Sequence, residues 1–208
     1  MGRACYAAIL AILLLFTAAN AGAAEVTVSL NEAFFDELLN AMFQNFDPPT
    51  FPVTENKSSG CDESIKILRE MNGVRTAVRF REGKVFVPLA FSGNYSIPFV
   101  GCTEFAGWAE SNIDLEFNKD SQRLTGRIRV LNVNLNGTGG IGGSIIAKML
   151  QGTIDKKINP IDILTLDKLS FAVPVSKSGD LRMKAVAVRN EIANSALNVV
   201  ITYQFQRS

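Results

Sequence analysis

The sequence predicts an α+β protein in which a long, curved antiparallel sheet wraps around one or two amphipathic helices. Two segments carry apolar residues at helical spacing, and much of the chain after residue 65 alternates apolar with polar residues at strand spacing. Short polar turns such as Glu82-Gly83 separate these strands, as they do in β-hairpins. Antiparallel strands interrupted by helices are typical of α+β proteins.

Residues 1–24 have the features of a secretory signal peptide. Arg3 supplies a positive charge, residues 7–16 form an unbroken apolar run, and small residues from Ala18 to Ala24 provide a cleavage site. The apolar run is shorter than the roughly 20 residues that span a bilayer. We therefore expect a secreted or periplasmic protein whose mature chain, residues 25–208, forms a single α+β domain without a transmembrane anchor.

The first helix is expected after a short alternating stretch, Val26–Val28. Ser29 and Glu32 have the spacing of a capping box. One broad apolar stripe follows at helical spacing, made of Phe34, Phe35, Leu38, Leu39, Met42, Phe43 and Phe46. The sequence Asp47-Pro48-Pro49 then ends the helix.

The strands follow in two groups on either side of a second helix. The first group is predicted at residues 74–80, 85–91, 113–117 and 124–135, with the apolar phase slipping between Val130 and Leu131. Such a slip predicts a bulge or a strand that changes faces. The second helix is expected from about Ile141 to Ile158, and the last strands at residues 169–175, 181–189 and 197–205.

Two cysteines remain after the leader, Cys61 and Cys102, because Cys5 is removed with it. An even pair in an oxidising compartment predicts a disulfide. Closing a loop of about 42 residues stabilises a fold by about 4 kcal/mol in the chain-entropy model. A reactive or metal-binding pair is the alternative interpretation.

Composition argues against most catalytic designs. The chain has no histidine, which excludes Ser-His-Asp and Cys-His catalysis and histidine-ligated zinc. Removing Arg3 from 21 basic residues leaves 20, equal to the 20 acidic residues, so the mature chain has no general attraction to nucleic acid. We predict a protein that is not an enzyme and that uses neither a cofactor nor a metal.

Residues 137–142 match the glycine pattern of a dinucleotide-binding turn, G-x-G-x-x-G, between a predicted strand and a predicted helix. The strand before it alternates polar and apolar residues, whereas a strand of a parallel nucleotide-binding unit is apolar throughout. The favoured interpretation is therefore a flexible entry to the second helix.

The two apolar stripes are wider than a single packed core requires, which predicts an apolar gap between the helices and the sheet. Such a gap would hold a lipid or another apolar small molecule. The candidate lining residues are Phe34, Leu38, Met42, Ile145, Met149 and Ile154. Arg75 and Arg79 are candidates for contact with an anionic head group, or else lie on a solvated strand face. The alternative is a fully packed structural protein that binds a protein partner in the cell envelope.

The order of elements from Val26 to Phe205, and the amphipathic segment from Leu150 to Pro160, resemble the tubular lipid-binding (TULIP) superfamily, including its small bacterial periplasmic members. Members of that superfamily have a strongly curved antiparallel sheet rolled around a long helix. The resemblance implies binding of a lipid or other apolar ligand between the sheet and the helices.

Overall fold

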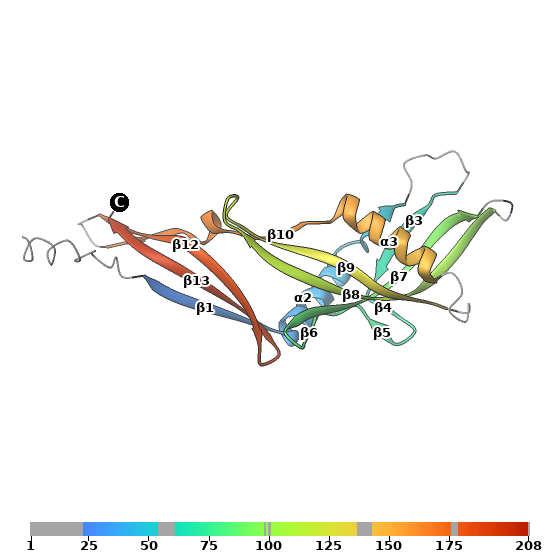
Figure 1. Ribbon diagram of the computed structural model, residues 1–208, viewed down its shortest axis with the longest axis horizontal. Helices are drawn as coiled ribbons and strands as arrows, with labels where there is room; N and C mark the ends of the chain where they lie inside the picture. Colours follow the sequence, from blue (N-terminus) through green and yellow to red (C-terminus); the bar gives the residue numbers. More distant parts are fainter. Residues whose placement is uncertain are drawn as a thin grey trace, which may run out of the picture.

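The computed structural model describes residues 23–53, 61–97, 99, 101–136, 143–175 and 179–207. These residues form an elongated molecule of curved antiparallel sheets and two α-helices, which confirms the predicted α+β fold class (Figure 1). The predicted signal peptide up to Gly22 and the glycine-rich segment 137–142 lie outside the described residues.

A four-stranded antiparallel sheet forms one end of the molecule (Figure 1). In spatial order it consists of β1 (Ala24–Asn31), β13 (Ala196–Arg207), β12 (Asp180–Ala193) and β11 (Phe171–Pro174). The register places Val26 opposite Ile201 and Leu30 opposite Leu197, so apolar residues of neighbouring strands share one face.

The second sheet is larger and also antiparallel. In spatial order it consists of β10 (Ile161–Thr165), β9 (Arg123–Leu135), β8 (Gly101–Asn118), β7 (Lys84–Ile97), β3 (Ser64–Leu68) and β2 (Thr50–Pro52). A short strand, β6 (Arg79–Arg81), also pairs with β7, and β4 (Glu70–Met71) pairs with β5 (Val74–Arg75) in a separate small hairpin. A 3-10 turn, η2 (Leu166–Leu169), connects β10 to β11.

The predicted single strand at residues 74–80 is divided into β5 and β6, which is a correction to the sequence prediction. The hydroxyl of Thr76 donates to the Leu68 carbonyl at 2.6 Å and accepts from the Ala90 N–H at 3.0 Å. The Ala77 N–H donates to the carbonyl of Pro88, which has no N–H to offer in return. These contacts replace a regular ladder across residues 76–78.

The first helix, α2 (Glu32–Asn45), follows β1 directly. Its N-cap is Asn31, whose side chain accepts from the Phe34 N–H at 2.9 Å, so the predicted capping box at Ser29 is wrong. Ser29 still belongs to β1, where its hydroxyl donates to Asn198 on β13. The Glu32 carboxylate accepts from the Phe80 N–H at 2.8 Å instead of folding back on its own helix.

The second helix, α3 (Gly143–Lys157), lies along the part of β9 that β10 does not pair with. Gln151 accepts from the Val130 N–H at 2.7 Å, and Asn159, just after the helix, accepts from the Ile128 N–H and donates to the Ile128 carbonyl. Asp155 accepts from both amides, and these hydrogen bonds, that of Asn159 first, hold its pKa below the ordinary value. The side chains of Gln151 and Asn159 thus bond to backbone groups of β9 that a neighbouring strand would otherwise pair with.

A bulge lies next to this contact. The β8–β9 register shifts between Glu110 and Ser111, whose partners are Asn132 and Val130, so Leu131 has no partner and its side chain is exposed. The slip predicted between Val130 and Leu131 is confirmed as a β-bulge.

The core consists of two clusters of buried apolar residues. One joins Phe80 and Leu124 of the second sheet to the inner face of β12 and β13, and the other joins Ile65, Phe91 and Leu150 between the second sheet and α3. The described residues of α2 include none that is buried, although Phe35 packs against the first cluster.

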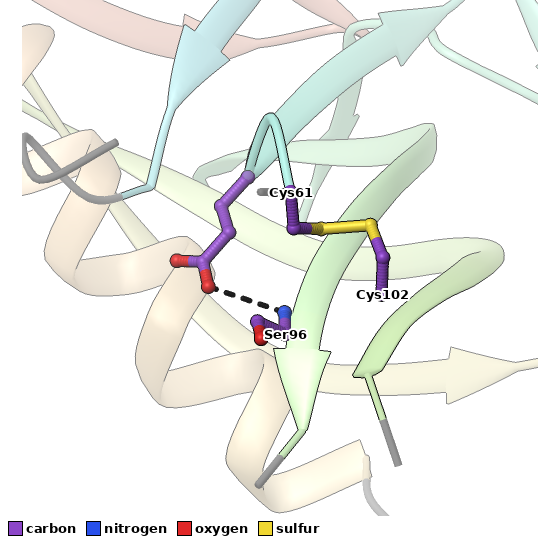
Figure 2. Close-up of a disulfide and its surroundings, with 4 residues drawn as sticks. Cys61, Ser96 and Cys102 are labelled. Atoms are coloured by element: carbon purple, nitrogen blue, oxygen red, sulfur yellow. Dashed lines mark hydrogen bonds between the residues drawn. A yellow bond between two sulfur atoms is a disulfide. The ribbon is translucent and has the colours of Figure 1, made fainter. Parts of the chain in front are cut away.

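The predicted disulfide between Cys61 and Cys102 is present, with the two Cα atoms 5.4 Å apart. It joins Cys61, in the turn before β3, to Cys102 at the start of β8 (Figure 2). Beside it, the Glu63 carboxylate accepts a hydrogen bond from the Ser96 N–H. Because Cys102 lies opposite Ser96 on β7, the bond ties β3 and β8 together across the end of the strand between them.

Replacing both cysteines, Cys61→Ser and Cys102→Ser, is expected to lower the free energy of unfolding by about 2–4 kcal/mol, because the unfolded chain is then free of a long closed loop. Urea-induced unfolding measures the change. The wild-type protein in reductant serves as the control and should match the double variant, whereas equal stability with and without reductant would contradict the assignment.

Candidate functional site

A large apolar cavity lies between α2, α3 and the concave face of the second sheet. Its volume is about 520 Å³. The side chains that form its walls include Leu39 and Phe43 from α2, Val87 and Leu89 from β7, and Leu150 and Ile154 from α3. Apolar pockets of several hundred Å³ are typical of small-molecule binding sites.

The polar groups at this cavity are few. Asp47, Thr76 and Thr153 are the polar residues in its lining, and the hydroxyl of Thr76 already bonds to Leu68 and Ala90. The cavity can therefore shelter hydrocarbon from water, but it offers little hydrogen bonding to a buried polar ligand.

A second apolar cavity of about 370 Å³ lies toward the four-stranded sheet. Its lining includes Leu30 on β1, Phe35 on α2, Val85 on β7, and Leu197 and Val199 on β13. Val78, in the irregular segment between β5 and β6, lines this cavity as well as the larger one.

Helix α2 presents two different apolar rows. Phe35, Leu39 and Phe43 are half-buried and line the cavities. The neighbouring row, Phe34, Leu38 and Met42, continues to the C-cap residue Phe46, and all four side chains are exposed, from 42% for Met42 to 72% for Phe46. Met42 and Phe46 also contribute to the lining, so the exposed row borders the mouth of the larger cavity.

A third row of α2, made of Glu32, Asp36 and Asn40, is polar and holds the helix in place. Arg79 lies 3.1 Å from the Asp36 carboxylate and 3.6 Å from that of Glu32. The three side chains are about 30% exposed, so solvent screens this interaction only in part.

Asn40 is the end of this polar row. Its carbonyl oxygen accepts from Arg69 at 2.8 and 3.0 Å and from Arg75 at 3.2 Å. Arg69 also donates to the Thr76 carbonyl. Burial, together with the nearby charge of Arg75, lowers the pKa of Arg69 below its usual value. The amide of Asn40 therefore satisfies a guanidinium that has lost part of its hydration.

The predicted lining residues divide between the cavity and the surface. Met42 and Ile154 line the larger cavity, and Met149 packs against the second core cluster. Phe34, Leu38 and Ile145 are exposed, and none of them lines either apolar cavity. Each lies one helical position from a residue that faces inward, namely Phe35, Leu39 and Ile146.

The predicted head-group residues also lie outside both linings. Arg79 is paired with carboxylates of α2, and Arg75 contacts Asn40 and lies 3.8 Å from Glu70. Arg75 is about half exposed, whereas Arg79 is mostly covered. The two arginines therefore attach α2 to the β4–β6 region.

Sequence reasoning missed Leu39 and Phe43 as lining residues, together with all lining residues of the sheet. The row Phe35, Leu39 and Phe43 has the same helical spacing as the predicted row Phe34, Leu38 and Met42, so apolar periodicity does not distinguish the two rows. The polar row Glu32, Asp36 and Asn40 is the sequence feature that indicates which apolar row faces inward, because its partners fix the rotation of the helix.

Neither a model of a known protein family nor a curated protein sequence matches this chain. Among the described residues, neither helix has the length and apolar character needed to cross a membrane.

Asn40→Ala is expected to lower the free energy of unfolding by about 1.5–3 kcal/mol, because Arg69 then loses an acceptor while it remains partly buried. Urea-induced unfolding measures this change. The matched control is Asn45→Ala at the end of the same helix, where the exposed amide donates to the Ala41 carbonyl. Equal effects of the two substitutions would show that Asn40 does not secure α2.

Proposed function

We propose that this protein binds a lipid or another apolar small molecule between its curved sheet and its two helices, and that it acts as a carrier and not as an enzyme. The observation that supports this function is the cavity of about 520 Å³ with an almost wholly apolar lining. Contiguous apolar surface that is left open to water commonly marks a binding site. An apolar cleft of this size is therefore unusual for a protein with only a structural role.

Desolvation would supply the binding free energy. Each methylene that moves from water into the cavity contributes about 0.8 kcal/mol. The exposed Met42 and Phe46 at the mouth give an arriving chain an apolar surface to contact first. Arg75 is the better candidate for an anionic head group, since the charge of Arg79 is already balanced by Glu32 and Asp36.

The proposal includes an extracytoplasmic location and membership of the TULIP superfamily. The disulfide supports the location, because such bonds persist in oxidising compartments. The curved antiparallel sheets around two helices support the superfamily assignment, since they match the architecture that the order of elements implied.

A second candidate is a protein that binds an envelope partner through an apolar surface. The exposed row Phe34, Leu38, Met42 and Phe46 favours it, because contiguous exposed apolar side chains mark interaction sites. The two candidates differ in whether the cavity is occupied when the protein is isolated.

Native mass spectrometry of gently purified protein, followed by solvent extraction, distinguishes these candidates. A carrier is expected to show an added mass that extraction removes, and the stripped protein should gain thermal stability when fatty acids or phospholipids are added. Ligand-free spectra together with no thermal shift would reject the carrier function.

A substitution that fills the larger cavity is expected to remove binding. Ile154→Trp places a ring where a 3% exposed side chain lines the cavity, and we expect it to weaken fatty-acid affinity by about tenfold or more. The matched control is Ile145→Trp, on the same helix but 60% exposed, which should bind as the wild type does. Calorimetric titration of both variants, after circular dichroism has confirmed their fold, measures the difference. Unchanged affinity in Ile154→Trp would place the ligand elsewhere.

A further inference from the structure

The two apolar cavities meet end to end. On α2 the lining passes from Phe35 in the smaller cavity to Leu39 in the larger one, a single helical turn. On β7 it passes from Val85 to Val87, which are consecutive positions on the inward face of the strand. The same boundary falls between Ile161 and Ile163 on β10.

Val78 lies at this boundary and contributes to both linings. Its segment is fixed on both sides, because Thr76 and Ala77 bond to the sheet and the Val78 carbonyl accepts from Arg79 at 2.8 Å. Val78 is therefore an apolar wall residue at the junction of the two cavities, on a backbone that is fixed in place.

We propose that the two cavities are compartments of one channel for a single long, unbranched hydrocarbon chain, and that Val78 at their junction determines which chains can pass. This inference rests on the proposed binding function and adds the class of ligand and the residue that selects it. From Phe35 to Phe43, α2 runs beside both compartments for about 12 Å at about 1.5 Å per residue. A short chain fills one compartment, whereas a long chain gains further burial only by passing Val78.

The test is a chain-length series with delipidated protein: octanoate, laurate, palmitate and arachidate, titrated by calorimetry below their micelle concentrations. Wild-type affinity is expected to rise from laurate to palmitate. In Val78→Trp that rise is expected to disappear, so palmitate binds about tenfold or more weakly than to the wild type and no more tightly than laurate. The matched control is Val175→Trp, at an exposed position that lines neither compartment. Its affinity should rise with chain length as that of the wild type does.

Several outcomes separate this inference from the function on which it rests. If Val78→Trp binds palmitate as tightly as the wild type does, the single-channel inference is overturned and the binding function stands. If the wild type binds no member of the series, both fail. Should Val78→Trp not fold, Val78→Ala answers the same question, because a wider junction is expected to improve the affinity for a palmitate with a mid-chain methyl branch about tenfold. Unchanged affinity for the branched chain would overturn the inference.

Discussion

The structure depends on a mismatch between the concave apolar surface of its curved sheets and the two helices available to cover it. Helix α3 lies close to β9 and contributes buried side chains such as Leu150 and Ile154. Helix α2 contributes no buried side chain and extends over the remaining concave surface. Apolar side chains consequently line an open gap between the helices and the sheets instead of interlocking, which is the origin of both cavities.

Polar contacts determine where each helix lies. Gln151 and Asn159 connect α3 to the unpaired edge of β9, and Asn40 connects α2 to Arg69. Hydrogen bonds are directional and apolar contacts are not, so these amides fix the position of each helix although they bury little surface. A helix held by its polar row need not collapse onto the sheet, and α2 can therefore cover a cavity without filling it.

Much of the fold could be predicted from local patterns, because period-two alternation, helical stripes and an even cysteine pair each reflect a short-range constraint. The bulge near Leu131 was visible as a slip in that alternation. The rotation of α2 does not follow from the apolar pattern, since Phe34 and Phe35 both belong to apolar rows, and the polar row that pairs with Arg79 selects the inward one. The interruption of the predicted strand at Thr76 could not be predicted either, because it depends on a hydrogen bond from the Ala90 N–H, which is distant in the sequence.

The unfolding free energy of delipidated Val87→Phe tests the central claim most directly, because Val87 faces the larger cavity from a rigid strand. If the interior is unfilled, the larger ring occupies existing space, and the variant should be at least as stable as the wild type. If the interior is in fact fully packed, overpacking should destabilise the variant by about 1–3 kcal/mol, and that result would contradict the account.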